Sequence, residues 1–239
     1  MPSPAPARPR RRMSKPLVTA LLALAAGAAA ANDRPYQYAR TAVMEDDEQV
    51  WSVESWLERR GPVRGLSVEP EYTFDAGTSV QVQLSRYVDS GGEQTGRETE
   101  IEFKQVFNHI GRDGWGLGLS GAIGVERNAA GAVRHASLKL PLSLDLGEGT
   151  ATLHLNAGIT KESTSPRAWT SGVAIEREVF KRTLLFAELA REGELRFAQI
   201  GARHWLRREK LAIDLAWQQQ GTDGRRDRGF ILGLGWYDL

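Results

Sequence analysis

From about residue 47 to the C-terminus, apolar and polar residues alternate with a period of two. This is the period of a β-strand whose two faces meet different surroundings. The same region shows no 3.6-residue repeat long enough for a helix. We therefore predict an all-β chain of twelve antiparallel strands, with ranges 50–59, 66–74, 78–87, 96–109, 114–126, 132–146, 150–160, 168–180, 182–190, 194–205, 211–220 and 228–239.

The alternation predicts a sheet with one apolar face and one polar face. In 66–74, leucine, valine, tyrosine and phenylalanine occupy one face, and serine, glutamate and threonine the other. In 211–220, leucine, isoleucine and tryptophan oppose Asp214 and Gln218. A transmembrane β-barrel requires this pattern between lipid and lumen. A soluble barrel or sandwich alternates in the same way with its apolar face inward, so alternation alone does not separate the two classes.

The positions of the tryptophans distinguish a membrane barrel from a soluble one. Six of the seven fall near predicted strand ends, where the interfacial girdles of a membrane barrel lie. A soluble core would concentrate them at strand centres, and only Trp56 falls in the middle of the predicted wall. We therefore expect a transmembrane β-barrel with a membrane girdle of Trp51, Trp115, Trp169, Trp205, Trp217 and Trp236.

The links between strands support a membrane barrel. Every second link, beginning with the second, is brief, as periplasmic turns are. Most of the others are longer and rich in Gly, Ser, Asp, Asn and Pro, including 88–96, 127–133, 161–167 and 221–228. The first and ninth links are short exceptions. With an even number of strands, both termini are expected in the periplasm.

The one long apolar run lies near the N-terminus. Residues 17–31, LVTALLALAAGAAAA, follow a basic stretch and end in alanines, which is typical of a cleaved secretory signal. The run is short for a bilayer-spanning helix, which needs about 20 residues. We expect cleavage after Ala31, with translation starting at Met1 or Met13. The predicted organisation is a signal peptide over 1–31, a short periplasmic segment over 32–46 and a barrel over 47–239, in the outer membrane of a Gram-negative bacterium.

Composition excludes several classes. Without the signal, five of the 31 basic residues are lost, which leaves 26 against 30 acidic residues. Neither this balance nor any basic stripe indicates a nucleic-acid partner. The absence of cysteine excludes a disulfide scaffold. A polytopic helical membrane protein is also excluded, because it would need repeated apolar runs of about 20 residues.

The predicted lumen face is strongly charged. Its first, second and fourth strands form an acidic sector of Glu54, Glu58, Glu69, Glu71, Glu98, Glu100 and Glu102. The opposing positive charge would come from Lys104, Lys139, His135, His154 and Arg196. Such a lumen is either a charged path that selects solutes or a set of paired charges in a barrel that conducts nothing. Both interpretations stay open here.

One pair of residues suggests an enzyme. His135 and Ser137 are two apart on a predicted strand and share a face, so the imidazole could accept the serine proton. Outer-membrane phospholipases and lipid A deacylases use such a His-x-Ser pair. Here Lys139 shares that face, and no polar residue directly follows the serine. We expect no enzyme, with a lipid hydrolase as the alternative.

No cofactor or metal is expected. The four histidines are dispersed over four predicted strands without metal-binding spacing. The glycines of GWGLGLSGAIG, at 114–124, indicate a strand with a small-residue lumen face rather than a nucleotide-binding loop.

Residues 32–110 contain NDRPY, then GLSVEPEYTFDAGTSVQVQLSRY, then ETEIEFKQVF. This order resembles the outer-membrane channels assigned to a phenol meta-pathway degradation family. The resemblance implies a barrel and a role in solute uptake, and identifies no functional residue. The final strand, GFILGLGWYDL, resembles the aromatic-rich ends recognised by the barrel-assembly machinery, although it ends on Leu239 rather than phenylalanine.

The function expected from the sequence is a porin-like, passive transport channel for an unnamed small solute. A lipid-acting enzyme and a non-conducting structural barrel are the alternatives, since a fold does not determine its use. The expected partners are outer-membrane lipid and the assembly machinery.

Overall fold

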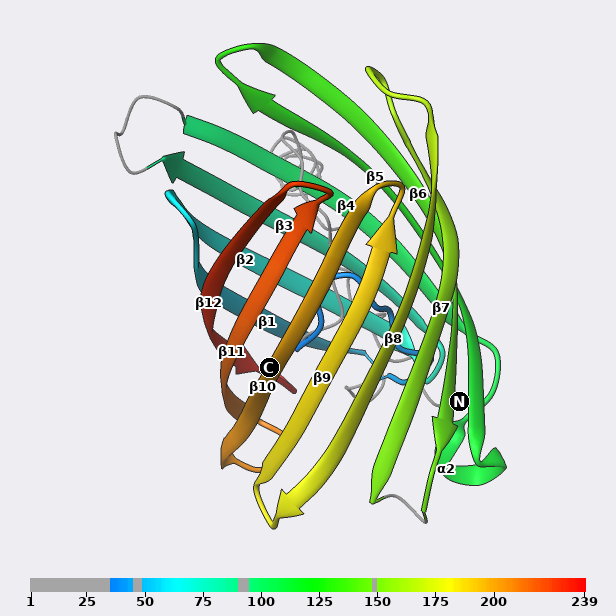
Figure 1. Ribbon diagram of the computed structural model, residues 1–239. Helices are drawn as coiled ribbons and strands as arrows, with labels where there is room; N and C mark the ends of the chain where they lie inside the picture. Colours follow the sequence, from blue (N-terminus) through cyan, green and yellow to red (C-terminus); the bar gives the residue numbers. More distant parts are fainter. Residues whose placement is uncertain (1–34, 45–48, 90–94, 148–149) are drawn as a thin grey trace, which may run out of the picture.

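The computed structural model describes residues 35–44, 49–89, 95–147 and 150–239. Twelve antiparallel strands close into one barrel, in which each strand pairs with its sequence neighbours and β1 pairs with β12 (Figure 1). The strands are β1 (Val50–Arg60), β2 (Val63–Asp75), β3 (Thr78–Asp89), β4 (Thr95–Val106), β5 (Trp115–Asn128), β6 (Gly131–Asp145), β7 (Ala151–Glu162), β8 (Arg167–Phe180), β9 (Thr183–Glu192), β10 (Leu195–Arg207), β11 (Leu211–Thr222) and β12 (Arg225–Trp236). The predicted all-β barrel of twelve strands is confirmed.

Tight hairpins replace two of the predicted loops. The predicted loops at 127–133 and 221–228 were wrong, because the strands run through them and pair almost to the tip, as Asn128 with Gly131 and Thr222 with Arg225. Gly131 (φ 130°) and Gly224 (φ 100°) take backbone conformations that other residues rarely adopt. A stretch rich in Gly, Asn and Asp therefore makes a sharp turn here rather than a long loop.

One helical turn interrupts the all-β pattern. The predicted fourth strand stops at Val106 instead of residue 109, and α2 (Ile110–Asp113) follows it. The side chain of Asn108 accepts the N–H of Leu117 at 2.9 Å and donates to the carbonyl of Trp115 at 2.7 Å. These bonds tie the link back to β5. Among the described residues, no helix is long and apolar enough to cross a membrane.

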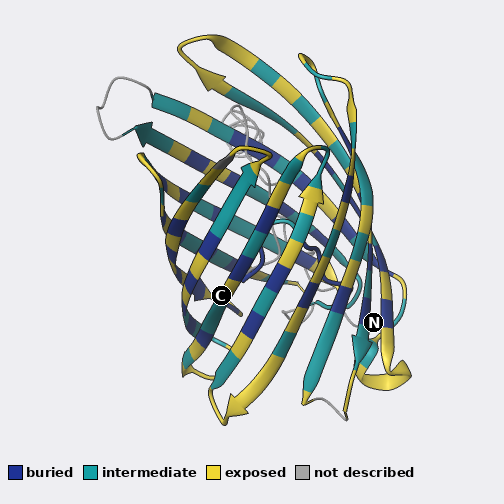
Figure 2. Cartoon of the chain, in the orientation of Figure 1, coloured by how far each residue is buried: buried dark blue, intermediate teal, exposed yellow. Residues whose placement is uncertain are grey.

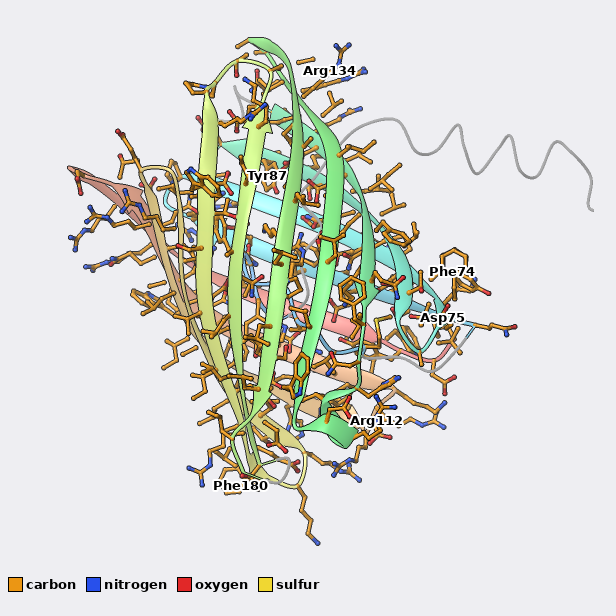
Figure 3. All side chains as sticks on the ribbon, turned by 90° about the vertical axis from the view of Figure 1, so that its right-hand side faces the viewer. Phe74, Asp75, Tyr87, Arg112, Arg134 and Phe180 are labelled. Atoms are coloured by element: carbon orange, nitrogen blue, oxygen red, sulfur yellow. The ribbon has the colours of Figure 1, made fainter. Side chains whose placement is uncertain are left out.

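The apolar face of the wall points away from the barrel axis. Alternating buried and exposed stripes run along every strand (Figure 2), and Phe74 projects outward (Figure 3). Ile123 and Ile200 are 64% and 60% exposed although they lie in the middle of strands. Soluble proteins rarely expose so continuous an apolar belt. The belt is in the position to contact lipid, as the alternation requires, and includes Leu57, Leu66, Leu84, Phe103, Leu138, Leu140, Leu189, Leu215, Phe230 and Leu232.

A small apolar cluster lies inside the barrel and was not predicted. Trp56, which the sequence places in the wall, is only 4% exposed and faces inward. It belongs to a cluster with Phe186 and Ile231 of the wall, the wall alanines Ala174 and Ala216, and Tyr36 and Ala39. The last two residues precede the first strand, so the cluster joins the wall to a segment inside it.

The tryptophans expected in the girdle do not all face outward. Trp51, Trp115 and Trp236 are exposed at the end of the barrel where the chain terminates, and Trp169 is exposed at the start of β8. Trp217 faces outward near the middle of β11. Trp205 differs, because it shares the inner face of β10 with Arg203 and its ring packs 5.3 Å from that of Tyr237.

Candidate functional site: the barrel lumen

Residues 35–44, which we call the lumen segment, lie inside the barrel. Tyr36, Ala39 and Ala42 have no exposed surface, and the blue trace of the segment lies within the ring of strands (Figure 1). The sequence predicts a periplasmic segment over 32–46, and nothing in that pattern predicts its entry into the lumen. Residues 32–34 and 45–46 lie outside the described part of the chain.

Glu188 binds the backbone of the lumen segment. The carboxylate of Glu188, on β9, accepts the backbone N–H groups of Gln37, Tyr38 and Ala39 at 2.8, 2.8 and 2.6 Å. Hydrogen bonds to a charged acceptor are stronger than neutral ones. One wall residue therefore fixes three consecutive residues of the segment.

Other wall side chains bind the same backbone. The amide of Asn156 accepts the N–H of Arg40 and donates to its carbonyl, both at 2.8 Å. The hydroxyl of Ser143 accepts the N–H of Ala42 at 2.9 Å. Two further donors reach carbonyls of the segment: Lys139 to Tyr38 at 2.9 Å and Gln199 to Pro35 at 2.7 Å.

Arg40 is the charged anchor of the segment. Its Nε lies 2.8 and 2.7 Å from the two carboxylate oxygens of Glu102, and Glu100 lies 4.0 Å from the guanidinium. Ser120 also donates to Glu102, at 2.7 Å. Arg40 and both glutamates are at most 2% exposed. Because a buried charge is costly without a partner, Arg40 and this acidic pair depend on one another.

Glycines of β5 make room for the segment. Gly116 faces the lumen, and a Cβ atom there would lie 2.3 Å from the carbonyl oxygen of Ala42. At Gly118, two residues on, a Cβ atom would first meet the wall, at 3.0 Å from the carbonyl oxygen of Gln105, and the Cβ of Ala42 lies 3.7 Å away. Gly116, one of the glycines that the sequence assigns to a small-residue lumen face, thus admits the backbone of the lumen segment.

A serine, a histidine and a glutamate from three adjacent strands meet below the segment. Ser143 lies 2.8 Å from Nδ1 of His154, and Nε2 of His154 lies 3.8 Å from Glu176. Tyr36 donates to Glu176 at 2.6 Å and packs on the imidazole. Burial and the nearby Glu176 raise the pKa of Tyr36, so its phenol stays protonated and donates. The segment covers this group, which sequence spacing could not reveal.

A second ionic group lies in the lumen at the end near the C-terminus of the chain. Arg203 donates to Asp214 at 2.8 and 3.0 Å and to Glu54 at 2.8 Å. Tyr237 also donates to Glu54, and the rings of Trp205 and Tyr237 lie 5.7 and 5.5 Å from the guanidinium. The group narrows this end of the lumen.

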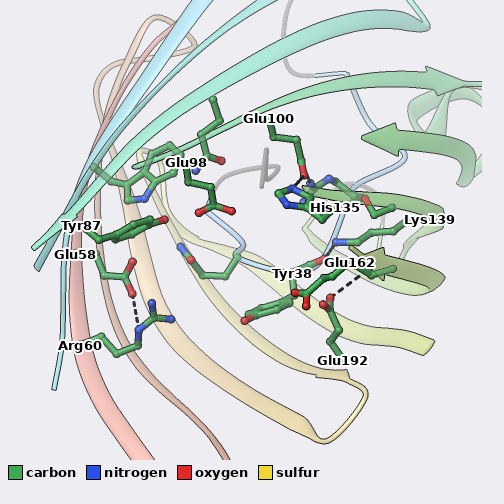
Figure 4. A pocket seen from close by; sticks show the side chains of 16 residues that line it. Tyr38, Glu58, Arg60, Tyr87, Glu98, Glu100, His135, Lys139, Glu162 and Glu192 are labelled. Atoms are coloured by element: carbon green, nitrogen blue, oxygen red, sulfur yellow. Dashed lines mark hydrogen bonds and ion pairs between the residues drawn. The ribbon is translucent and has the colours of Figure 1, made fainter. Parts of the chain in front are cut away.

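The opposite end, at the top of Figure 1, is hollow. A cavity of about 230 Å³, which we call the upper cavity, is bordered by Gln37, Tyr38 and Arg40 of the lumen segment, and Figure 4 shows Tyr38 in its lining. Its walls are Trp56, Glu58, Arg60, Gln83, Tyr87, Glu98, Glu100, His135, Ser137, Lys139, Thr160, Glu162 and Glu192. Two larger hollows nearer the rim share residues with it, so the cavity continues toward the upper end of the barrel.

The expected lumen residues mostly face inward. Glu54, Glu69, Glu100, Glu102, Lys104, Lys139 and His154 are at most 8% exposed on the inner face, and Glu71 is half-buried on the same face. Arg196 differs, because it is exposed at the rim and pairs with Asp223 at 3.2 Å. The acidic sector therefore meets Arg40 of the lumen segment, which was not among the expected cations.

His135 and Ser137 both line the upper cavity. Nε2 of His135 lies 2.7 Å from Glu100. Among the described residues, no hydrogen bond joins His135 to Ser137, and no group of three or more His, Asp and Glu side chains is arranged to hold a metal ion. The pair faces the aqueous interior rather than the lipid.

The fold is shared with solved membrane barrels. A KdgM porin in complex with disordered oligogalacturonate superposes with a TM-score of 0.60 at 11% identity, covering 79% of this chain and 99% of the porin. The NanC porin gives 0.56 at 7% identity, covering 79% and 100%. The chain has the fold of the outer-membrane β-barrels. LpxR from Salmonella typhimurium, at 0.55 and 9% identity, covers 78% of this chain and 99% of its own.

These likenesses fix the fold and no more, because all three identities are low. No family model and no curated protein matches the sequence. The function is therefore argued from the lumen itself.

Proposed function

We propose that this chain is an outer-membrane channel for small solutes in which the lumen segment controls passage. The observation that supports it is the upper cavity, which enters the barrel from one end and stops at Gln37, Tyr38 and Arg40. Charged groups on opposite walls provide polar contacts for a hydrated solute. The obstruction is a tethered segment and not the wall, so its displacement would lengthen the path.

The proposed location is the outer membrane of a Gram-negative bacterium, with both termini in the periplasm after cleavage near Ala31. The outward apolar belt and the barrel fold support it. We also propose that the barrel-assembly machinery inserts the chain and that its apolar belt contacts outer-membrane lipid. We propose in addition that the chain is a member of the phenol meta-pathway family. The early sequence motifs, NDRPY, GLSVEPEYTFDAGTSVQVQLSRY and ETEIEFKQVF, support the family assignment.

The solute of the KdgM structure does not transfer readily to this chain. Oligogalacturonate is a polyanion, whereas five glutamates line the upper cavity against two arginines and one lysine. Repulsion between like charges opposes a polyanion there.

Conductance across a planar bilayer tests the proposal. Gly116→Ala would push the Ala42 carbonyl away from the wall, because the added Cβ lies 2.3 Å from it. Gly121→Ala is the matched control on the same strand, since its Cβ would meet only Leu138 at an ordinary 3.7 Å. We expect small unitary currents from the wild type and from Gly121→Ala, and larger ones from Gly116→Ala. Silence from all three would instead indicate a non-conducting structural barrel.

The lipid hydrolase alternative has one supporting observation, the contact of Glu100 with His135 beside Ser137. A carboxylate that orients a histidine next to a serine is the arrangement of a nucleophilic site. Hydrolysis of phospholipid vesicles by the wild type, lost in Ser137→Ala, would favour it. We expect no hydrolysis, because the pair lies in the lumen.

A further inference from the structure

The charges of the upper cavity are unbalanced. Each of its fixed cations is already engaged: Arg40 by Glu102, and Arg60 by Glu58 at 3.4 Å. Lys139 donates to the Tyr38 carbonyl. The five glutamates therefore outnumber the two arginines and one lysine that line the cavity.

Three carboxylates of the cavity have no ion pair within the described part of the chain. They are Glu98 on β4, Glu162 on β7 and Glu192 on β9. Glu162 accepts from Ser165 at 2.8 Å and Glu192 from Thr160 at 3.4 Å, which are neutral hydroxyl donors. The three residues come from different strands, and their side chains border one hollow (Figure 4).

Gln83 provides an independent sign of a missing donor. The side chain is only 3% exposed, lines the same cavity and donates from Nε2 to Ser85 at 3.0 Å. Its Oε1 is buried and has no hydrogen-bond partner among the described residues. A buried acceptor without a partner is costly and rare. A ligand with N–H groups would satisfy it.

Aromatic rings complete the lining. Tyr38, Trp56 and Tyr87 all border the upper cavity. Aromatic faces attract cations and also pack against methylene groups. A charged amine with an aliphatic stem matches both the rings and the carboxylates.

We propose that the upper cavity binds small organic cations, amines or guanidinium compounds. The cationic group lies among Glu98, Glu162 and Glu192, and one N–H donates to Oε1 of Gln83. The aliphatic part packs on Tyr38 and Tyr87. The inference rests on the proposed function only in taking this cavity as the entrance for the solute.

Calorimetry on the purified full-length barrel in detergent tests the site with putrescine as the probe. Succinate and glycerol provide the anionic and neutral comparisons. We expect putrescine alone to bind, and its affinity to fall about tenfold or more in Glu98→Gln, in Glu192→Gln and in Gln83→Leu, because each loses a hydrogen bond or charge contact to the ligand. Glu178→Gln, an exposed carboxylate at the opposite end of the barrel, is the control and should bind as the wild type does.

Binding and bilayer current separate the two proposals. Putrescine binding without any current would overturn the channel and leave the cation site standing. Currents with no putrescine binding, or equal binding of succinate, would overturn the cation site and leave the channel. Unchanged affinity in all three cavity variants would also overturn the site, since putrescine would then bind elsewhere.

Discussion

Glu188→Ala tests how the lumen segment is held. The substitution removes the one carboxylate that accepts three consecutive backbone N–H groups, those of Gln37, Tyr38 and Ala39. It leaves the strand pairing of β9 untouched, because the side chain points inward and is 1% exposed. The docked state of the segment should therefore lose stability while the barrel stays closed.

The free energy lost by the docked segment can be estimated from the three hydrogen bonds. A hydrogen bond to a charged group contributes about 1.5–3 kcal/mol. Three bonds that share one acceptor are not additive, and water solvates the N–H groups once the segment leaves, so we expect about 2–3 kcal/mol for the whole anchor. This corresponds to a change of roughly 30- to 150-fold in the ratio of docked to undocked segment.

Thiol labelling measures that ratio, because the chain has no cysteine. Ala39→Cys places a single thiol at a position with no exposed surface. We expect a maleimide to label Ala39→Cys slowly and the double variant with Glu188→Ala roughly 30 to 150 times faster. Glu178→Ala on the same background is the control, since Glu178 contacts Arg208 and not the segment. A labelling rate within about twofold of the parent would refute the role of Glu188.

Three further outcomes are expected. Arg203→Ala should lower the stability of the barrel in lipid vesicles by about 3–5 kcal/mol, because Glu54 and Asp214 lose their buried partner; an unchanged urea midpoint would contradict this ion group. Ile200→Arg should cost about 2–4 kcal/mol in the same assay, as a charge at mid-wall must enter lipid; unaltered folding would contradict the lipid-facing belt. N-terminal sequencing of the exported chain should begin at Asn32, and any start upstream of residue 17 would show that the signal is retained.

The wall could be predicted because strand geometry enforces a period of two. Leucine and glutamate at alternate positions can only face opposite sides, so the inner position of Glu69 and Glu102 follows from parity alone. The twelve strands and their pairing of neighbours follow from the same alternation and from the turn residues between runs. Two hairpin ends differ from the prediction, because Gly131 and Gly224 allow tight two-residue turns where longer loops were expected.

The lumen segment could not be predicted from periodicity. It is short and irregular, and its contacts join residues far apart in the chain, as Ala39 and Glu188, which are 149 positions apart. The sequence carries no local signal for such a pair. The glycines of β5 indicate a small-residue lumen face in the sequence. The structure gives the reason for one of them, because the backbone of Ala42 lies against Gly116.

Trp205 shows where parity fails. Both Phe197 and Arg203 lie on the inner face of β10, so the strand has no clean alternation from which to assign its sides. The pairing of β10 with β11 also shifts between Trp205 and Arg207. Inside the lumen an aromatic ring is stable because Tyr237 and Arg203 pack against it. Position along a strand therefore does not by itself place a tryptophan at the membrane interface.

The wall binds the backbone of the lumen segment through Glu188, Asn156 and Ser143. It also binds two large side chains, Tyr36 and Arg40, while Ala39 and Ala42 are fully buried. Contacts to peptide groups do not depend on side-chain identity, so the sequence of the segment is constrained mainly at these four residues. A free peptide that keeps them could then occupy the vacated site in a shortened chain, and a blocker supplied in trans would replace the covalently attached segment.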